Sequence, residues 1–425
     1  MNIDEVIQRN ISSGRRLKLL ALTSLEWMLV AGGVMVTSLT LPSIIEGLSG
    51  TVGDSTTMAS SVFIGMLVGA LVSGAISDRF GRKWTNLCLL ILAAAGTGLT
   101  GFAPSMRLFS VFRFLSGLGY GGLLPVVNAY LTEFSSIKIR GLYLTLLESS
   151  WALGSIMVGA FTMLTLDSLG WQWSYYFLFI FGIPLIMIGL FLPESPKFEF
   201  MKKGKKALEK ILKTSIKEEV EMHEREKQPL LSIFKKGLAR RTLMIWFSWF
   251  TVSFVYYGIY TWAPKIFASK GLTPVSSLWY TFFMLIMQLP GYLTAAFLIE
   301  KIGRKTTLTF FFVATAISAL IMGLVTSSGF LIFASILISM SVLGTWGMVY
   351  AYTPELYPTE MRGLGNGTSG VMARTAGIIA PYFTNFFMGR TGSVIYVMIF
   401  MSVMSVLAAI IVALFGVETK EKIIE

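Results

Sequence analysis

Twelve long apolar runs limit this chain to one broad class of fold. A run of about 20 apolar residues forms a helix long enough to cross the hydrocarbon core of a bilayer. The strands of a membrane barrel would instead alternate apolar and polar positions. We therefore predict an all-α membrane protein with twelve transmembrane helices. The runs cover roughly 18–43, 57–77, 84–104, 107–131, 141–166, 173–192, 242–263, 276–299, 305–326, 328–351, 364–388 and 393–416.

The composition supports this interpretation. Charged residues make up 14% of the chain and hydrophobic residues 54%, whereas a soluble domain has about 25% charged residues. The formal net charge of +12 is compatible with nucleic-acid binding, but the basic residues fall in loops on one side of a twelve-helix arrangement. Positively charged loops remain in the cytoplasm. We predict a multi-pass protein of the cell membrane, in contact with lipid and not with nucleic acid, with both termini cytoplasmic.

Two charged joints reveal an internal repeat. The segment "SDRFGRK" at 77–83 returns as "IEKIGRK" at 299–305, and "AYLTEFSSIKIRG" at 129–141 returns as "AYTPELYPTEMRG" at 351–363. Both pairs are offset by the same 222 residues. Parallel repeats with a site between them are one way in which transporters are built. We therefore predict two pseudo-symmetric six-helix bundles.

The repeat divides the chain into three parts. We predict a first six-helix half at 1–192, a cytoplasmic linker with amphipathic helices at 193–241, and a second six-helix half with a short tail at 242–425. Because each joint keeps an acid, a glycine and basic residues in one register, we predict a conformational latch at the rim between the halves. The alternative is that these residues only set the topology. The latch set is Asp78, Arg79, Gly81, Arg82, Glu133, Arg140, Glu300, Lys301, Gly303, Arg304, Glu355 and Arg362.

These motifs resemble a known family. "GAISDRFGRK" at 74–83 resembles the signature between helices 2 and 3 of the major facilitator superfamily, and "RFLSGLGYGG" at 113–122 resembles its fourth-helix motif. "PESPKF" at 193–198 resembles a segment shared by sugar porters and organic-ion carriers. "ARTAGIIAP" at 373–381 is most similar to organic-anion, organic-cation and nicotinate-type carriers. The resemblance implies alternating access around a central cavity, a small-molecule substrate, and a role for Asp78 in the outward-open state.

Two departures from the family pattern bear on the substrate and on proton coupling. The glutamine pair that sugar porters carry early in helix 7 is absent from "WFSWFTVSFVYYG" at 246–258. This departure disfavours hexoses. "LVAGG" at 29–33 lacks the aspartate that proton-coupled relatives often carry in helix 1, which argues against proton coupling through that position.

Four ionisable residues fall inside the apolar runs, namely Glu26, Arg113, Glu148 and Arg374. A charge at the centre of a transmembrane helix costs at least about 2.5 kcal/mol, so each is a functional candidate. Arg374 is the candidate for binding a carboxylate, because a guanidinium grips one with two parallel hydrogen bonds. The alternative is a structural ion pair. Glu148 is the first candidate for a coupling proton and Glu26 the second, although the basic stretch at 15–18 would also neutralise Glu26. Arg113 is a candidate for coupling or for helix packing.

Aromatic and amide residues complete the predicted substrate site. A cavity with aromatic walls and a few placed polar groups suits a flat, ring-bearing ligand. For any single residue the alternative is packing, or anchoring at the membrane surface. Besides Arg374 and Glu148, the predicted substrate-binding residues are Asn128, Tyr256, Tyr257, Gln288, Trp346 and Tyr350, with Trp262 as a further candidate for the cavity wall.

The sequence lacks the residues that membrane enzymes use. The only histidine, His223, lies in the linker, and the only cysteine, Cys88, lies in an apolar run. We therefore predict no enzymatic activity, no metal site and no cofactor. The function we predict is that of a monomeric secondary active transporter that moves an organic, preferentially aromatic, acid together with a proton. A sugar carrier, an organic-cation carrier and a sensor that binds solute without moving it are the alternatives.

Overall fold

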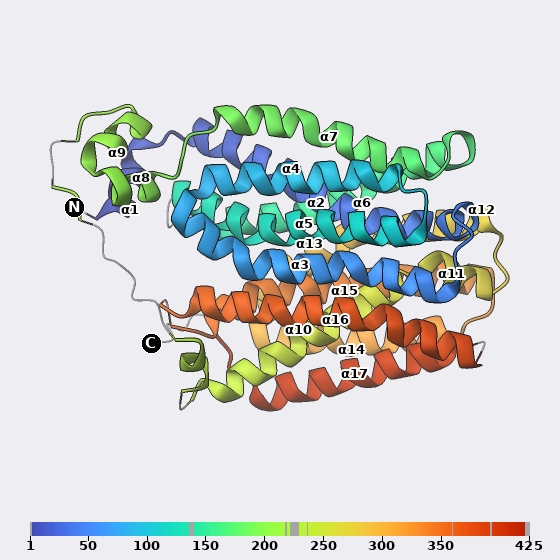
Figure 1. Cartoon of the computed structure of the whole chain (residues 1–425). Helices are drawn as coiled ribbons and strands as arrows, with labels where there is room; N and C mark the ends of the chain where they lie inside the picture. The colour runs from blue at the N-terminus through green and yellow to red at the C-terminus, as the bar shows by residue number, and fades with distance from the viewer. Residues whose placement is uncertain are drawn as a thin grey trace.

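The computed structural model describes residues 2–135, 140–216, 219–221, 229–235, 237–358, 360–391 and 393–420. In this part of the chain, long helices run side by side in two groups (Figure 1). The first group is α2 (Ser13–Gly47), α3 (Val52–Phe80), α4 (Arg82–Gly101), α5 (Met106–Phe134), α6 (Arg140–Leu169) and α7 (Gln172–Phe191). The second group is α10 (Ala239–Tyr260), α12 (Pro274–Ile286) with α13 (Gln288–Ile302), α14 (Arg304–Leu324), α15 (Ser328–Glu355), α16 (Arg362–Thr391) and α17 (Ile395–Phe415). With α12 and α13 taken as one span, each half has six spans, as predicted.

The composition of α16 sets it apart from the other spans. Within the described ranges, eleven helices are long and apolar enough to cross a membrane, and α16 is not among them. It is 30 residues long but carries Arg374 and many glycine and hydroxyl residues. It packs against α3 of the first half and α10 of its own half, and in Figure 1 it lies at the edge of the second group that faces α3. Because protein surrounds much of its surface, α16 can carry polar groups that lipid would not accommodate.

The predicted span at 276–299 is interrupted. It consists of α12 and α13, which meet at Met287 and Gln288. Proline has no backbone N–H and its ring clashes with the carbonyl four residues earlier, so it is accommodated in the first turn of a helix rather than in its middle. The break places Pro290 in the first turn of α13. It also leaves Gln288 fully buried at the start of that turn.

Glycine is required at both charged joints. Gly81 ends α3 with φ +99°, and Gly303 ends α13 with φ +86°. This left-handed region is disfavoured for residues that carry a Cβ. A Cβ on Gly81 would also collide with the Glu194 carboxylate, and a Cβ on Gly303 with that of Glu418. The two joints therefore have the same backbone conformation and the same kind of neighbour.

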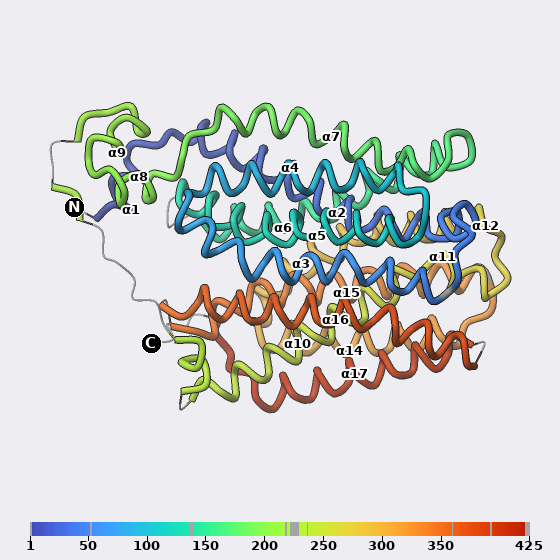
Figure 2. The backbone as a smooth tube through the Cα atoms, viewed as in Figure 1, coloured from blue at the N-terminus to red at the C-terminus, as the bar shows by residue number. Residues whose placement is uncertain are grey.

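Short helices gather at one end of the bundle. They include α1 (Ile3–Asn10), α8 (Pro196–Lys203), α9 (Lys205–Leu212) and η1 (Leu230–Phe234), while α11 (Ala263–Ser269) lies at the opposite end. Ile3, Val6 and Ile7 of α1 pack with Leu208 and Leu212 of α9 in a small hydrophobic cluster of their own. Figure 2 shows both chain ends on the side of these helices. We call this side, which also holds the Gly81 and Gly303 joints, the basic end, and the opposite side the far end.

Candidate substrate-binding site

A cavity lies between the two halves. The empty space among its side chains, counted with its open mouth, is about 470 Å³. Helices α3, α5 and α6 of the first half and α10, α13, α15 and α16 of the second all contribute to its wall. The lining residues are Phe63, Met66, Leu124, Glu148, Trp151, Tyr256, Tyr257, Tyr292, Leu343, Trp346, Tyr350, Ala373 and Arg374.

Six of the eight predicted substrate-binding residues lie on this wall. The other two support it from behind. Asn128 hydrogen-bonds the carboxyl of Glu148, and the fully buried Gln288 donates from Nε2 to the hydroxyl of Tyr256 at 3.3 Å. Trp262 is also fully buried, but away from the cavity.

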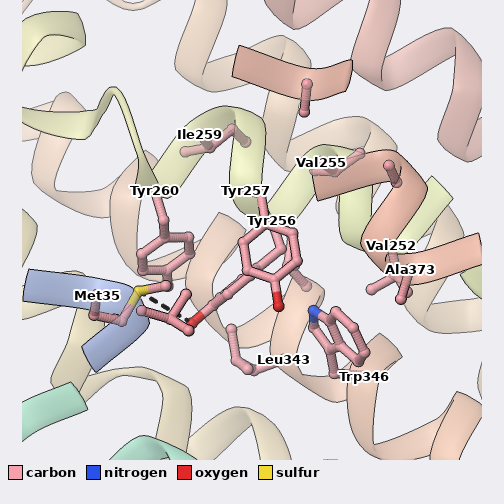
Figure 3. Close-up of a cluster of buried hydrophobic side chains, with 14 of the residues drawn as sticks. Met35, Val252, Val255, Tyr256, Tyr257, Ile259, Tyr260, Leu343, Trp346 and Ala373 are labelled. Carbon is pink, nitrogen blue, oxygen red and sulfur yellow. Dashed lines mark hydrogen bonds between the residues drawn. The ribbon is translucent and has the colours of Figure 1, made fainter. Parts of the chain in front are cut away.

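The hydroxyl of Tyr256 joins the two halves at the cavity. It accepts a hydrogen bond from Nε1 of Trp151, on α6 of the first half, at 3.0 Å. It also donates toward the sulfur of Met35 on α2, at 3.5 Å (Figure 3). A movement of one half against the other must therefore change the hydrogen bonds of this hydroxyl.

Aromatic rings pack closely along the second half of the wall. Trp346 stacks on Tyr350 with ring centres 5.7 Å apart and an angle of 27° between planes. Tyr256 meets Trp346 edge-on at 6.1 Å, and Tyr257 meets Phe63 of the first half at 4.3 Å. Figure 3 shows the α10 tyrosines gathered against Trp346 and Leu343 of α15. Rings held by such contacts offer flat apolar faces at fixed orientations.

Two nitrogen donors at the cavity have no partner among the described residues. They are Nε1 of Trp346 and Nε of Arg374, both buried. Arg374 is held in place by a hydrogen bond from Nη1 to the carbonyl of Gly370 at 3.1 Å. A buried donor without an acceptor costs about 1–3 kcal/mol. A ligand that carries acceptor oxygens would remove this cost.

Arg374 and Glu148 attract each other across the cavity. The ion pairs formed by the described residues all lie at the basic end. Arg374 and Glu148 therefore do not form an ion pair with each other. This geometry disfavours the alternative of a closed structural ion pair. The cavity therefore combines one cation, one acid and aromatic walls.

Comparison with known proteins gives the family. A sequence model described as "Sugar (and other) transporter" matches residues 32–425. The niacin transporter NiaP of Acinetobacter baylyi is 33% identical, over 96% of this chain and 95% of that protein. This protein belongs to the sugar (and other) transporter family of the major facilitator superfamily.

Other comparisons agree with this assignment. The putative niacin/nicotinamide transporter NiaP of Bacillus subtilis is 32% identical, over 96% of this chain and 98% of that protein. The partially occluded inward-open structure of the xylose transporter XylE from E. coli superposes with a TM-score of 0.78 at 18% identity, covering 97% of this chain and 100% of that chain. At that identity the likeness concerns the fold. The relatives are transporters and not enzymes, so this family member is a transporter in a membrane.

The two remaining ionisable candidates lie inside the first half of the transporter, away from the cavity. Arg113 is fully buried and donates from Nη2 to the carbonyl of Gly33 at 2.8 Å, which ties α5 to α2. Glu26 accepts hydrogen bonds from Asn86 of α4. The basic stretch at 15–18 is not its recorded partner: Arg15 and Arg16 donate to backbone carbonyls, and Lys18 is exposed.

The latch set forms one network in each half of the transporter. Arg82 pairs with Glu133 at 3.1 Å and with Asp78 at 3.2 Å. Arg304 repeats this with Glu355 at 3.0 Å and Glu300 at 3.6 Å. These bonds lie within a half, and the latch between the halves stays a prediction.

The other members of the latch set lie near these networks. Arg79 and Lys301 lie over the rings of Phe80 and Phe297. Arg140 pairs with Asp4 of α1 at 3.6 Å. Arg362 donates to a backbone carbonyl, that of Tyr357, at 3.3 Å.

Hydrogen bonds between the halves lie at the cavity or toward the far end. Besides those of Tyr256, Ser38 of α2 donates to the carbonyl of Tyr260, and Ser60 of α3 donates to that of Ile378 at 2.9 Å. Ser38 lies in the last third of α2 and Ser60 in the first third of α3, both on the far-end side of the cavity. Among the described residues, the halves are thus held together on that side.

Sequence reasoning missed several wall residues. Trp151 is the most important, because it donates to Tyr256 from the opposite half. It follows Glu148 by three positions in "ESSW", a spacing that puts both on one helix face, so the signal was present. Phe63 and Tyr292 have no charged residue nearby in the sequence and offered no such signal.

Proposed function

We propose that this transporter moves an aromatic carboxylic acid of the pyridine-carboxylate type together with a proton. The observation that carries the proposal is the pair of unpartnered donors, Trp346 Nε1 and Arg374 Nε, in a narrow cavity with aromatic walls. A carboxylate offers two acceptor oxygens, and the adjoining ring would lie against the faces of Tyr257 and Tyr350. The names of the two bacterial relatives, which refer to niacin, support the same class.

Charge balance in the cavity explains why a proton would travel with the acid. Without substrate, the carboxylate form of Glu148 would be the countercharge of Arg374 across the cavity. A carboxylate that binds Arg374 replaces it in this role and leaves Glu148 as a second negative charge in apolar surroundings. Uncompensated charge in such surroundings is costly, so the entering acid favours proton binding at Glu148. By linkage, the proton favours binding of the acid to the same degree.

We further propose that the basic end faces the cytoplasm of the cell membrane, as the distribution of positive loops predicts. Because the inter-half hydrogen bonds lie at the cavity or toward the far end, substrate would enter and leave from the basic end in this conformation. Opening to the other side requires the bonds of Ser38 and Ser60 to break. One monomer contains the complete cavity.

A counterflow assay in proteoliposomes tests this function. Nicotinate, nicotinamide, benzoate, an organic cation and a hexose would be offered to the wild type and to Arg374→Gln. A matched control is Arg390→Gln, since Arg390 lies on the same helix but against the ring of Phe386 at the helix end. We expect exchange of the carboxylates, its loss in Arg374→Gln and its retention in Arg390→Gln.

Other outcomes would identify the alternatives. Exchange of a hexose or a cation that survives Arg374→Gln would replace the aromatic acid with that substrate. Binding of an acid without any exchange would favour a sensor. Carboxylate exchange that does not respond to an imposed pH gradient would remove the proton from the proposal and leave the substrate in place.

A further inference from the structure

A second buried acid lies outside the substrate cavity. Glu26 of α2 is 1% exposed, and Asn86 of α4 is 5% exposed. Nδ2 of Asn86 lies 3.0 and 3.1 Å from the two oxygens of the Glu26 carboxyl. The amide oxygen of Asn86 is buried and has no hydrogen-bond partner among the described residues.

No cation of the described residues compensates Glu26. The charged residue nearest in the sequence, Lys18, is exposed, and Arg15 and Arg16 donate to backbone carbonyls. Among the described residues, one other titratable side chain interacts electrostatically with Glu26. It is Tyr130 of α5. Its hydroxyl donates to the carbonyl of Pro193 at 2.7 Å.

The remaining neighbours on this stretch of α2 are small and apolar. Helix α6 presents Gly154 to the backbone of Met28, and α7 places Gly182 beside Leu29. Neither helix presents a charged group at these contacts. Among the described residues, Asn86 is the one recorded hydrogen-bond partner of the Glu26 carboxyl.

An ionised carboxylate in such a place is costly, since burial removes its water and supplies no countercharge. A protonated carboxyl removes this cost. It also gives the amide oxygen of Asn86 a donor. A half-turn of the Asn86 amide places this oxygen where Nδ2 stands, within hydrogen-bond distance of the Glu26 carboxyl, and the acid O–H then donates to it.

We propose that Glu26 and Asn86 form a second proton-binding site of the transporter, inside the first half and separate from the substrate cavity. Its ligand is a single proton held on Glu26, and Asn86 positions that proton. Because the pair links α2 to α4, release of the proton requires water to reach the space between these helices. Proton occupancy and the packing of α2 against α4 are therefore coupled. The site needs no substrate and does not depend on the proposed aromatic acid.

Infrared spectroscopy of the full-length protein in lipid nanodiscs tests the site, because a protonated carboxyl has a carbonyl band that a carboxylate lacks. The wild type would be compared at neutral pH with Glu26→Gln and Glu26→Asp. Glu26→Gln keeps the size of the side chain but has no proton to lose, and Glu26→Asp keeps the carboxyl with a shorter reach. We expect the loss of one carboxyl band in Glu26→Gln, and a shifted band in Glu26→Asp and in Asn86→Leu.

Glu148→Gln is the control that separates the two acids, since its spectrum should retain the Glu26 band. Identical spectra for the wild type and Glu26→Gln at neutral pH would show that Glu26 is ionised, and would overturn the proposal. A Glu26 band that does not move in Asn86→Leu would remove Asn86 from the site. Neither result bears on transport of the aromatic acid, so failure of one proposal is distinct from failure of the other.

Discussion

The two charged joints, one in each half, use the same hydrogen bonds in different surroundings. In the first, the Glu194 carboxylate accepts from the backbone N–H groups of Arg82 and Lys83 at 2.8 and 3.0 Å. These N–H groups belong to the first turn of α4 and have no partner within the helix. A carboxylate at this place also suits the helix dipole. Tyr130 of α5 fixes the segment that carries Glu194 by a bond to the carbonyl of Pro193 at 2.7 Å.

The second joint repeats this arrangement. Glu418 accepts from the N–H groups of Arg304 and Lys305, which open α14, at 2.7 and 3.2 Å. Tyr352 of α15 donates to the carbonyl of Val417 at 2.5 Å. The repeated sequence thus specifies the repeated bonds, down to the acid that closes the turn.

The surroundings of the joints differ because only the first is followed by α8 and α9. Phe198 of α8 lies 5.7 Å from the Arg82 guanidinium, and Asp4 of α1 holds Lys197 of α8 at 2.7 Å. The second joint meets the short tail at 416–420. Accordingly the Glu133 side chain is 13% exposed, and that of its counterpart Glu355 is 34% exposed.

The pKa values of Glu194 and Glu418, the two acids that accept from the helix N-termini, shift in opposite directions. Burial raises the pKa of Glu194, and the N–H groups that it accepts from do not fully compensate. At Glu418 burial also acts to raise the pKa, but the backbone N–H groups of Arg304, Lys420, Thr419 and Lys305 outweigh it and the pKa is lowered. Lower burial and one additional backbone donor, the N–H group of Lys420, both favour the ionised form of Glu418 over that of Glu194.

The largest expected difference between the joints concerns their glycines. Gly81→Ala should lower stability by about 2 kcal/mol or more, because the left-handed backbone disfavours a Cβ and the new methyl meets Glu194 and Phe198. Gly303→Ala should cost about 1–2 kcal/mol, since the methyl there meets a side chain on a short tail that can shift. Thermal unfolding in detergent measures both. Equal losses would show that α8 adds nothing to the first joint.

Loss of the acid that pairs with the joint arginine should also lower stability more at the first joint than at the second. Glu133→Gln should cost about 2 kcal/mol, since Glu133 is the less exposed of the two acids and its loss leaves the partly buried Arg82 with a weaker acceptor. Glu355→Gln should cost about 1 kcal/mol or less, because water reaches that pair. The melting temperatures of the two variants give the comparison. A greater loss at Glu355 would contradict the account of burial.

The pH dependence of the joints should have opposite signs. In an unfolded chain the pKa of a glutamate is about 4.3. The raised pKa of Glu194 gives a contribution that is present below that value and is lost as pH rises through the folded pKa. The lowered pKa of Glu418 gives one that is present above that value and is lost as pH falls.

Melting curves of Glu194→Gln and Glu418→Gln at neutral and acidic pH measure these signs. On acidification, the wild type should gain stability relative to Glu194→Gln and lose it relative to Glu418→Gln. Parallel changes in both comparisons would mean that the two carboxyls have the same surroundings.

The smallest expected effect concerns α1, which packs at the first joint and has no counterpart at the second. Asp4→Asn removes the pairs with Lys197 and Arg140, and partly exposed pairs contribute about 0.5–1 kcal/mol. Hydrogen exchange should become faster in α1 and stay unchanged at the second joint. Unchanged exchange in α1 would show that its apolar residues, and not Asp4, hold it in place.

Much of this architecture could be predicted from the sequence, because each half buries similar apolar faces and repeats the same turn residues. Arg374 and Glu148 stood out since charges are rare in apolar runs. The partner of Glu26 could not be found in this way. Asn86 is 60 residues away, and only the packing of α2 against α4 brings the two together. In the same way, the unpartnered nitrogen of Trp346 becomes visible only when its neighbours are known.

The most direct test of the central account measures nicotinate binding and proton uptake together, in weakly buffered detergent solution. At a pH at which Glu148 is ionised in the free protein, the account predicts uptake of about one proton for each bound carboxylate, because the acid replaces Glu148 as the countercharge of Arg374. Glu148→Gln should bind nicotinate without proton uptake, Arg374→Gln should not bind it, and Arg390→Gln should match the wild type. Nicotinate binding that persists in Arg374→Gln, or proton uptake that persists in Glu148→Gln, would contradict the account.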